Sequence, residues 1–281
     1  MMKIAGVIGG GTMGAGIAQV SAAAGFQVHL LDISEQFVKQ GIGRIESFLK
    51  KGVARGKVTE AQMQEVLSRI HGTTSMADLS DCDIVVEAVF EQLELKKKTH
   101  GELDKIVKPE CILATNTSCL SVTEIAAATS RPGKMIGLHF FNPVPLMRLV
   151  EVITALQTEE KTVQDATAFC HAIGKQTVRV KDFPGFLVNH LLIPYINRSI
   201  DVLDHGWATR DEIDTAAKLG LGHPMGPLEL IDFDGLDVHH MTHEAMYTQT
   251  KDPKFAPPTL LTHMFKAGRF GKKSGKGFYE Y

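Results

Sequence analysis

The sequence predicts an α/β fold in two parts: a doubly wound parallel sheet over residues 1–182 and a smaller all-α domain over residues 183–281. In the first part, short apolar runs alternate with amphipathic segments, a pattern typical of parallel strands covered by helices. A glycine-rich turn separates the first strand from the first helix. Beyond Asp182-Phe183-Pro184-Gly185 helical periods dominate, so we place the domain boundary near residue 183.

The individual elements follow from the apolar runs and from residues that begin or end helices. Gly25 can end the first helix, and Pro109 blocks the continuation of a later one. Ser34 and Thr59 can cap the two helices between them. Strands are expected at residues 4–8, 28–31, 83–89, 111–115, 135–141, 149–153 and 176–180. Helices are expected at residues 12–24, from residue 34, from near residue 59, and at residues 93–107, 121–128, 159–173, 185–203, 210–219 and 236–250.

Composition and charge exclude several classes of protein. The formal net charge is -2, which argues against a whole-molecule attraction to nucleic acid or to an anionic membrane. No run of about 18 apolar residues occurs, so we expect no membrane span, and we expect no signal or transit peptide before the first strand. The four cysteines form no CxxC pair, which predicts buried thiols in a reducing, cytoplasmic compartment and no metal site.

One motif predicts a nucleotide site. The run Gly9-Gly10-Gly11-Thr12-Met13-Gly14 fits G-x-G-x-x-G, follows a strand and opens a helix. Glycines here allow a tight turn and a close approach of backbone to a pyrophosphate, which the positive helix end attracts. Asp32 ends the second strand, where an acid binds both ribose hydroxyls of NAD and repels the 2′-phosphate of NADP. We therefore expect a Rossmann-type domain that binds NAD; the alternative is a tight strand–helix turn without nucleotide.

Two polar residues interrupt apolar strands. His139 lies near the carboxyl end of the run at residues 135–141, where open α/β sheets bind their ligands. Glu151 is the one acid in the run at residues 149–153, so its burial would demand a partner, and a histidine is the natural one. Such a carboxylate would fix the imidazole tautomer and favour the imidazolium. The alternatives are a satisfied core histidine and an edge-strand acid that faces water.

Ser118 and Asn189 are two further candidates. Ser118 follows the strand at residues 111–115, again at the carboxyl end, although a serine there is more commonly a turn or N-cap residue. Asn189 shares an apolar helical stripe with Ile193 and Ile196, so its amide is expected to point inward. It would either orient a substrate or bond to backbone.

Positive charge gathers in two places. One cluster comprises Arg44, Lys50, Lys51, Arg55 and Lys57, and the other is Lys96-Lys97-Lys98. The usual interpretation of both is a solvated helix face. The alternative for the first cluster is a site for a phosphate-rich ligand such as coenzyme A.

Together with these candidate residues, longer stretches of the sequence resemble the 3-hydroxyacyl-CoA dehydrogenases, and the resemblance covers nearly the whole chain. The stretches that carry the resemblance in the first part are VIGGGTMGAGIAQV from Val7, VVEAVFEQLELKK from Val85, ATNTSCLSVTEIA from Ala114 and GLHFFNPVPLMRLVEVI from Gly137. Those in the second part are DFPGFLVNHLLIPYINRSI from Asp182, KLGLGHPMGPLELIDFDGLD from Lys218 and GRFGKKSGKGFYEY from Gly268. One departure is Cys119, where many relatives carry a second serine.

The resemblance implies a role for each site residue. It implies that His139 is the catalytic base, Glu151 its acidic partner, and Ser118 and Asn189 the substrate contacts. The implied NAD contacts are Gly9, Gly10, Gly11, Thr12, Met13, Gly14, Asp32, Glu91, Lys96, Asn116, Ser118, Asn142 and Lys273. The implied coenzyme A contacts are Ser47, Lys51 and Arg55.

The resemblance also implies an activity: NAD-dependent oxidation of L-3-hydroxyacyl-CoA, as in the stand-alone 3-hydroxybutyryl-CoA enzymes of bacteria, in a homodimer formed through the helical domain. Two alternatives stay open. One is a dehydrogenase of a free 3-hydroxy acid, of the gulonate type. The other is a non-catalytic NAD-binding protein, although such a protein would not need His139, Glu151, Ser118 and Asn189 together. The 6-phosphogluconate and β-hydroxyacid types rely on a lysine where this chain carries Asn189.

Overall fold

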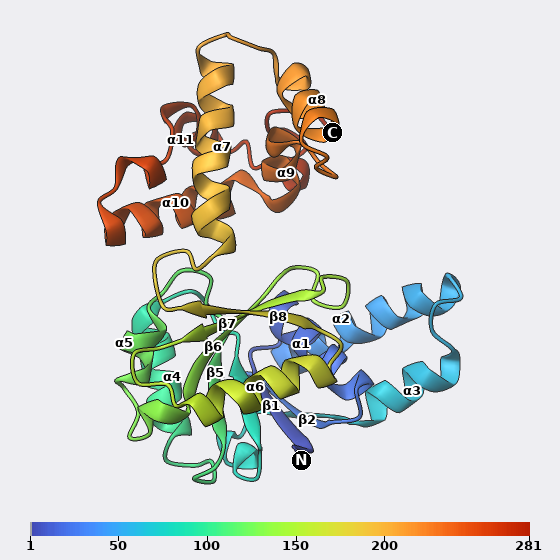
Figure 1. Ribbon diagram of the computed structural model, residues 1–281. Coiled ribbons are helices and arrows are strands. Elements are labelled where there is room, and N and C mark those ends of the chain that lie inside the picture. The colour runs from blue at the N-terminus through green and yellow to red at the C-terminus, as the bar shows by residue number, and fades with distance from the viewer. Residues whose placement is uncertain (1) are drawn as a thin grey trace. The chain divides into compact units, whose positions relative to one another are not determined.

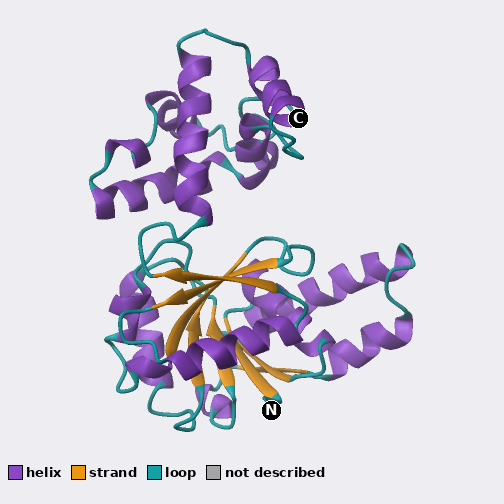
Figure 2. Cartoon of the chain, viewed as in Figure 1, coloured by secondary structure: helices purple, strands orange, loops and turns teal. Residues whose placement is uncertain are grey.

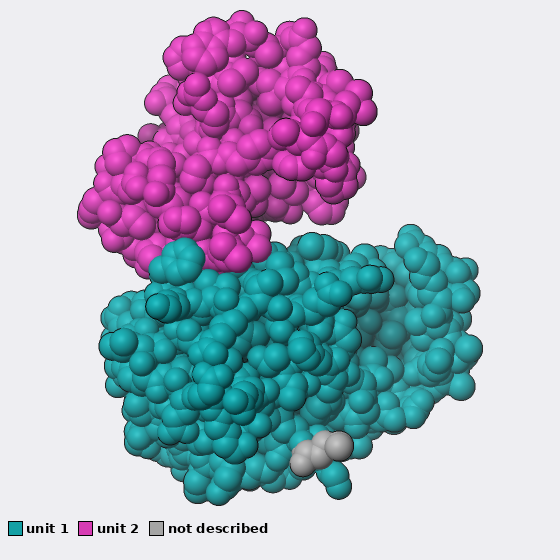
Figure 3. Space-filling model, in the orientation of Figure 1, with its two compact units in different colours: residues 1–183 teal, residues 184–281 magenta. Residues whose placement is uncertain are grey.

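The computed structural model describes residues 2–281 and divides the chain into two compact units, one ending at Phe183 and the other covering Pro184–Tyr281 (Figure 3). The first unit contains the sheet and the second is helical (Figure 2). The predicted fold class, an α/β domain followed by an all-α domain, is therefore confirmed. No helix within residues 2–281 combines the length and apolar character that a bilayer crossing requires.

One eight-stranded sheet forms the centre of the first unit, in the order β3-β2-β1-β4-β5-β6-β7-β8 (Figure 1). Its strands are β1 Ile4–Ile8, β2 Gln27–Leu31, β3 Ile70–Thr73, β4 Ile84–Glu87, β5 Ile112–Thr115, β6 Met135–Phe140, β7 Leu149–Thr154 and β8 Gln176–Lys181. All neighbouring strands run parallel except β6 and β7, which are antiparallel. The strand order reverses between β1 and β4, where doubly wound sheets bind their ligands.

Strand β3 was not among those predicted from the sequence. Its four residues, Ile-His-Gly-Thr, contain one buried residue and lie at the edge of the sheet. Such a strand has neither an apolar run nor a clear alternation, so only its pairing with β2 identifies it.

Helices cover both faces of the sheet. They are α1 Thr12–Ala23, α2 Glu35–Ala54, α3 Glu60–Ser68, α4 Leu93–Leu103, α5 Val122–Ala126 and α6 Glu160–Ala172, with 3-10 turns η1 Met76–Leu79 and η2 Pro132–Lys134. Ser34 and Thr59 accept hydrogen bonds from backbone N–H groups of α2 and α3, as the sequence predicts for N-caps. The α4 helix ends at Leu103, earlier than expected, and just beyond its end Arg131 donates to the carbonyl oxygens of Asp104 and Lys108.

The main core of the first unit lies between one face of the sheet and helices α1, α2 and α6. The buried side chains of this core include Ile17 of α1, Ile45 of α2 and Phe169 of α6. On β6, Ile136, Leu138 and Phe140 point into this core. Because successive side chains of a strand alternate between faces, residues 137 and 139 point to the opposite face, which α5 covers.

The second unit is a set of packed helices. They are α7 Val188–Asp204, α8 Arg210–Gly220, α9 Pro227–Asp234, α10 Leu236–Thr250 and α11 Thr259–Lys266, with 3-10 turns η3 Pro253–Phe255 and η4 Lys272–Ser274. Helices α9 and α11 were not predicted from the sequence, since eight residues are too few to display a helical period. Asp232 of α9 accepts hydrogen bonds from the backbone N–H groups of Phe278 and Tyr279, and so holds the C-terminal tail against this helix.

Candidate active site

The glycine-rich turn between β1 and α1 has the close contacts that require glycine. Gly9 has a φ of +102°, and a Cβ atom on it would lie 2.7 Å from the carbonyl oxygen of Ala88. A Cβ atom on Gly14 would lie 1.8 Å from the carbonyl oxygen of Gly9. Gly11, at the N-cap of α1, offers no side chain to the first turn of the helix, and a Cβ there would meet nothing within 4 Å. Gly11 and Thr12 at the start of α1 are exposed, as a pyrophosphate site at this helix N-terminus requires.

Asp32 follows β2 directly and lies against this turn. Its Oδ2 accepts a hydrogen bond from the backbone N–H of Gly10 at 2.7 Å, and its Oδ1 accepts one from Ile33 at 2.7 Å. Arg44 of α2 donates to the carbonyl oxygen of Gly10 at 3.1 Å. Arg44 is exposed, as predicted for the first cationic cluster, and it also supports the turn. The turn and the acid together fit the adenosine end of NAD.

His139 and Glu151 are brought together by the antiparallel pairing of β6 with β7. The two residues stand opposite each other in the register, and Nδ1 of His139 lies 2.7 Å from Oε2 of Glu151. Both side chains are buried, that of Glu151 completely. The His139 ring also packs on Phe141, with 4.6 Å between ring centroids. Since a carboxylate only accepts hydrogen bonds, a neutral imidazole in this arrangement donates through Nδ1 and has its lone pair on Nε2.

Asn116, directly after β5, forms hydrogen bonds with residues of both β4 and β6, next to the His139–Glu151 pair. Its Oδ1 accepts a hydrogen bond from the backbone N–H of Phe140 at 2.9 Å, next to His139. Its own backbone N–H donates to the carbonyl oxygen of Glu87 at 2.7 Å. The carboxyl ends of β4, β5 and β6 are therefore joined through one buried residue, by its side-chain and its backbone amide.

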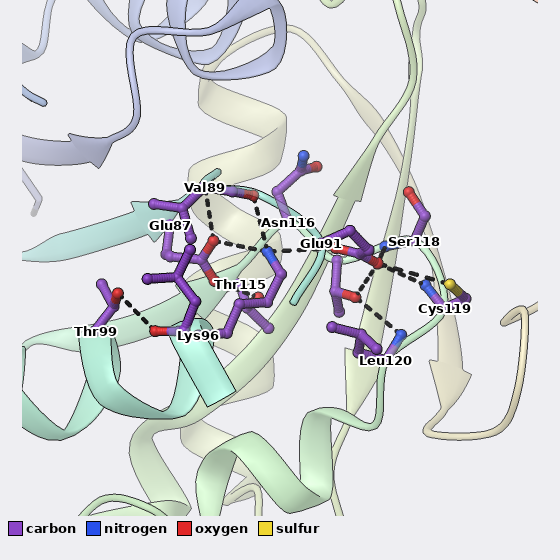
Figure 4. A network of polar contacts seen from close by, with 12 residues as sticks. Glu87, Val89, Glu91, Lys96, Thr99, Thr115, Asn116, Ser118, Cys119 and Leu120 are labelled. Carbon is purple, nitrogen blue, oxygen red and sulfur yellow. Dashed lines mark hydrogen bonds and ion pairs between the residues drawn. The ribbon is translucent and has the colours of Figure 1, made fainter. Parts of the chain in front are cut away.

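Ser118 lies in the loop after β5, and Glu91 holds that loop. Oε1 of Glu91 accepts hydrogen bonds from Thr117 Oγ1 at 2.5 Å, from the Ser118 backbone N–H at 2.8 Å and from the Cys119 backbone N–H at 3.2 Å (Figure 4). Burial raises the pKa of the Cys119 thiol to about 12, so this sulfur stays protonated beside the carboxylate. A single carboxylate oxygen thus fixes the backbone that presents Ser118.

Lys96 is not part of a solvated helix face, so that interpretation of the second cationic cluster is wrong for this residue. Its side chain is completely buried, and its Nζ lies 2.7 Å from Oε1 of Glu87 and 3.4 Å from Oε2 of Glu91 (Figure 4). The neighbouring Lys98 does match the prediction, with a side chain 73% exposed. The sequence alone cannot separate the two, because both stand on one short, highly charged helix.

Glu87 is a candidate site residue that was not predicted from the sequence. It is the last residue of β4, pairs in register with Thr115, and accepts a hydrogen bond from the Thr115 hydroxyl at 2.8 Å. Burial raises the pKa of Glu87, but the neighbouring His100 imidazole and Lys96 ammonium outweigh it and hold the pKa at about 2. The available signal was a lone acid at the end of an apolar strand, the same signal that singled out Glu151.

Two of the three residues implied for coenzyme A line one hollow of the first unit. A cavity of about 540 Å³ lies between α1, α2 and the loop after β6, and its lining includes Ser47, Lys51 and Asn142. Arg55 is the exposed C-cap residue of α2 and is not among the lining residues. The hollow therefore joins a candidate NAD contact and two candidate coenzyme A contacts.

The remaining two candidates belong to the second unit. Asn189 is the second residue of α7, and Lys273 is in η4. Nζ of Lys273 forms an ion pair with Oδ1 of Asp237 at 2.5 Å. Their roles toward ligands of the first unit stay predictions.

Comparisons with known proteins cover both units. The family model described as "3-hydroxyacyl-CoA dehydrogenase, NAD binding domain" matches residues 4–183, and the one described as the C-terminal domain of the same family matches residues 185–281. The chain is 47% identical over 276 residues to a probable 3-hydroxybutyryl-CoA dehydrogenase of Deinococcus radiodurans, covering 98% of this chain and 99% of the relative. A 3-hydroxybutyryl-CoA dehydrogenase of Mycobacterium tuberculosis is 44% identical over 278 residues, covering 98% and 97%.

Solved structures agree with the sequence relatives. The crystal structure of (S)-3-hydroxybutyryl-CoA dehydrogenase from Ralstonia eutropha superposes with a TM-score of 0.96 at 44% identity, covering 100% of this chain and 99% of that one. The two family models, the relatives that match over nearly the full chain and the solved structure with the same fold all indicate one family. The chain belongs to the 3-hydroxyacyl-CoA dehydrogenase family, an oxidoreductase family whose N-terminal domain binds NAD.

Proposed function

We propose that this chain catalyses the reversible, NAD-dependent oxidation of L-3-hydroxyacyl-CoA to 3-ketoacyl-CoA, with a short substrate such as 3-hydroxybutyryl-CoA. The observation that carries the proposal is the buried His139–Glu151 pair near the carboxyl edge of a nucleotide-binding sheet. The relatives from Deinococcus and Mycobacterium are named 3-hydroxybutyryl-CoA dehydrogenases, which supports a short acyl chain.

The residues of the first unit that we propose bind NAD lie just after the carboxyl ends of its strands or in the helices that follow them. The N–H groups at the start of α1 would hold the pyrophosphate, and Asp32 would bind the ribose hydroxyls. Glu91, Lys96, Asn116, Ser118, Asn142 and Lys273 complete the proposed set. When bound, NAD supplies the acceptor for the hydride that leaves C3 of the substrate.

His139 acts as the general base in this proposal. Its Nδ1–H donates to Glu151, which leaves the Nε2 lone pair to take the proton from the 3-hydroxyl group. The imidazolium that results is then stabilised by the Glu151 carboxylate, which lies 2.7 Å away. In the reverse direction His139 returns the proton to the 3-keto oxygen as it is reduced.

Ser118 and Asn189 hold the substrate oxygens in this proposal. The backbone of Ser118 is fixed by Glu91, so its hydroxyl can be presented without a large entropic cost. Asn189 has both a donor and an acceptor on its amide, and either suits the hydroxyl or the thioester oxygen. Coenzyme A would be held along α2, with its phosphates near Ser47, Lys51 and Arg55.

We propose a homodimer formed through the second unit. That unit carries large apolar side chains in contact with water, among them Leu219, Phe233 and Met241, which are 83%, 54% and 57% exposed. Light scattering at micromolar concentration should give twice the monomer mass, and a monomer would contradict the assignment. The four buried thiols suit a reducing compartment, and we propose a cytoplasmic location.

The loss of NADH absorbance on mixing with acetoacetyl-CoA tests the activity directly. We expect turnover with NADH and acetoacetyl-CoA, and far slower turnover with NADPH or with acetoacetate lacking coenzyme A. Oxidation of a free sugar acid such as gulonate, without activity on the thioester, would favour the free-acid dehydrogenase. Tight NADH binding with no turnover on either substrate would favour the non-catalytic protein.

A further inference from the structure

The loop after β6, residues 141–148, forms one wall of the hollow beside the glycine turn. Asn142 and Val144 of this loop are among the lining residues, as is Thr12 at the start of α1. Asn142 is exposed there and belongs to the proposed NAD contacts. The position of this loop therefore sets where a cofactor-binding amide stands.

Val144 seats the loop against α1. This residue is 2% exposed, and a Cβ atom on Gly16 of α1 would lie 2.8 Å from the Cβ atom of Val144. A larger residue at position 16 would therefore push the loop away. The loop thus packs directly on the helix whose N-terminus we propose holds the pyrophosphate.

The loop takes part of its support from a residue that is distant in sequence. Pro143 has no N–H to donate, and its carbonyl oxygen accepts the backbone N–H of Met147 at 3.0 Å. The carbonyl oxygens of Val144 and Met147 accept hydrogen bonds from Nζ of Lys175, the second at 2.8 Å. A buried carbonyl that lost its donor would carry a desolvation cost. One ammonium thus satisfies two carbonyl oxygens of the same loop.

The end of α6 places Lys175. Gly174 has a φ of +76°, and its backbone N–H donates to the carbonyl oxygen of His171 at 3.0 Å. The backbone N–H of Lys175 donates to the carbonyl oxygen of Cys170 at 2.9 Å. These two bonds form a Schellman motif, and β8 begins at the next residue, Gln176. The Lys175 side chain therefore starts from backbone that is fixed by a helix end on one side and a strand on the other.

A buried lysine is an expensive way to satisfy carbonyl oxygens. Lys175 is buried, both partners of its ammonium are carbonyl oxygens rather than carboxylates, and burial lowers the pKa of this group. Removing a charge from water costs more than removing an apolar side chain of the same length. What the ammonium supplies is two strong donors at a single point, which hold two carbonyl groups of the loop close together. The arrangement suits a loop whose exact position matters.

We propose that Lys175 is a positioning residue of the cofactor site: it holds the loop at residues 141–148 from behind, keeps Val144 against Gly16, and so fixes Asn142 where NAD binds. The inference rests on the proposed role of Asn142 as a cofactor contact. Lys175 itself touches no ligand in this proposal and acts only through the loop. Its removal should therefore weaken cofactor binding more than it slows the chemical step.

Lys175→Met tests the inference, with the Kd for NADH from fluorescence titration as the first readout. We expect the Kd to rise by about 10-fold, the scale of one hydrogen-bonded ligand contact. At saturating NADH, kcat should stay within about 3-fold of wild type, because the lost interaction concerns binding. Lys161→Met removes an exposed lysine of α6 and is the matched control, with a wild-type Kd expected. An unchanged Kd in folded Lys175→Met, or a large loss of kcat without a change in Kd, would overturn the inference.

A double-mutant cycle with Asn142→Ala identifies the route by which Lys175 acts. If Lys175 acts through Asn142, the double variant will bind NADH no more than about 3-fold more weakly than the worse single variant, because residues that act as one unit are not additive. Losses of affinity that multiply would show a route that bypasses Asn142 and would overturn the inference.

Val144→Ala tests the same loop without touching the ammonium, so it should fold even where Lys175→Met does not. It keeps every charge and every carbonyl group but opens a gap beside Gly16. We expect the Kd for NADH to rise by about 3-fold, since a looser loop holds Asn142 less firmly. An unchanged Kd in folded Val144→Ala would show that the position of the loop does not govern cofactor binding, and this too would overturn the inference.

Measurements on the wild-type protein separate this inference from the proposed function. Wild-type protein that binds NADH but does not turn over acetoacetyl-CoA would overturn the proposed activity, and the titrations would still decide the role of Lys175. Active wild-type protein whose Kd for NADH does not change on Lys175→Met substitution would leave the function standing and overturn the positioning role alone.

Discussion

His139 and Glu151 are direct cross-strand neighbours on the two antiparallel strands of an otherwise parallel sheet. Opposed residues of an antiparallel pair have their Cβ atoms about 4.5–5.5 Å apart, which suits a hydrogen bond between these two side chains. The observed Nδ1–Oε2 distance is 2.7 Å. The connection between β6 and β7 is short, so the pair forms between residues only 12 apart in sequence.

Replacing the imidazole tests the proposed base. His139→Gln should lower kcat by about 10²- to 10⁴-fold, the usual contribution of a positioned general base. NADH binding, followed by fluorescence titration, should change little because His139 is not among the cofactor contacts. His171→Gln, which removes an exposed histidine of α6, is the matched control and should keep wild-type kinetics. Near-wild-type turnover in His139→Gln would remove this residue from the mechanism.

Replacing Glu151 tests whether its carboxylate supports His139 as the general base. Glu151→Gln keeps the shape but removes the charge that stabilises the imidazolium, so kcat should fall by about 10- to 10³-fold, less than the loss of the imidazole itself. Some thermal stability should be lost as well, because Glu151 is completely buried. Steady-state kinetics on protein shown to be folded by circular dichroism separate the two effects. A folded variant with full kcat would contradict the assignment.

Removing the acid at the end of β2 tests cofactor choice. Asp32→Ala should raise the KM for NADH and narrow the preference over NADPH, because the acid that repels a 2′-phosphate is gone. Glu35→Ala removes an exposed acid from the first turn of α2 and serves as the control for a general change of charge. Equal cofactor constants in Asp32→Ala and wild type would show that this carboxylate does not touch the ribose.

Reversing a charge on α2 tests the coenzyme A site. Lys51→Glu should raise the KM for acetoacetyl-CoA by about 10-fold or more while leaving kcat nearly unchanged, because phosphates lie far from the reacting carbon. Lys39→Glu, an exposed position on the same helix outside the hollow, is the control and should leave KM unchanged. A loss of kcat with constant KM in Lys51→Glu would argue against a binding role.

The buried Glu87 predicts a specific acid sensitivity. Burial raises its pKa, yet the His100 imidazole and the Lys96 ammonium lower it further, from the ordinary 4.5 to about 2. A carboxylate whose pKa is lower in the folded state stabilises the fold above the unfolded pKa. That contribution is therefore complete above pH 4.5 and is lost as the pH falls from about 4.5 to about 2.

Urea unfolding across this pH range measures the effect. Glu87→Gln should cost on the order of 3 kcal/mol near pH 7, as expected when one partner of a buried ion pair is removed. The gap between wild type and variant should shrink as the pH falls below about 4.5. A gap that stays constant down to pH 3 would show that Glu87 titrates as it does in the unfolded chain.

Local chemistry made much of this chain predictable. The glycine turn was predicted from a local motif: Gly9 has a positive φ, and a side chain on Gly14 would meet the carbonyl oxygen of Gly9. The caps of α2 and α3 were predicted because Ser34 and Thr59 bond to their own helices. Glu151 was singled out because a lone acid in an apolar strand demands a partner. In each of these cases the deciding contacts lie close in sequence or concern one strand.

The sequence by itself determined the fold class, the glycine turn, the strand that carries His139 and the need of Glu151 for a partner, because all of these follow from short-range sterics and from the cost of burying charge. Only the tertiary structure decided that β6 and β7 pair with His139 opposite Glu151, that β3 joins the edge, and that Lys96 is buried against Glu87 while Lys98 faces water. These outcomes depend on which distant segments pack together, and neighbouring lysines on one helix look alike until the sheet beneath them is in place.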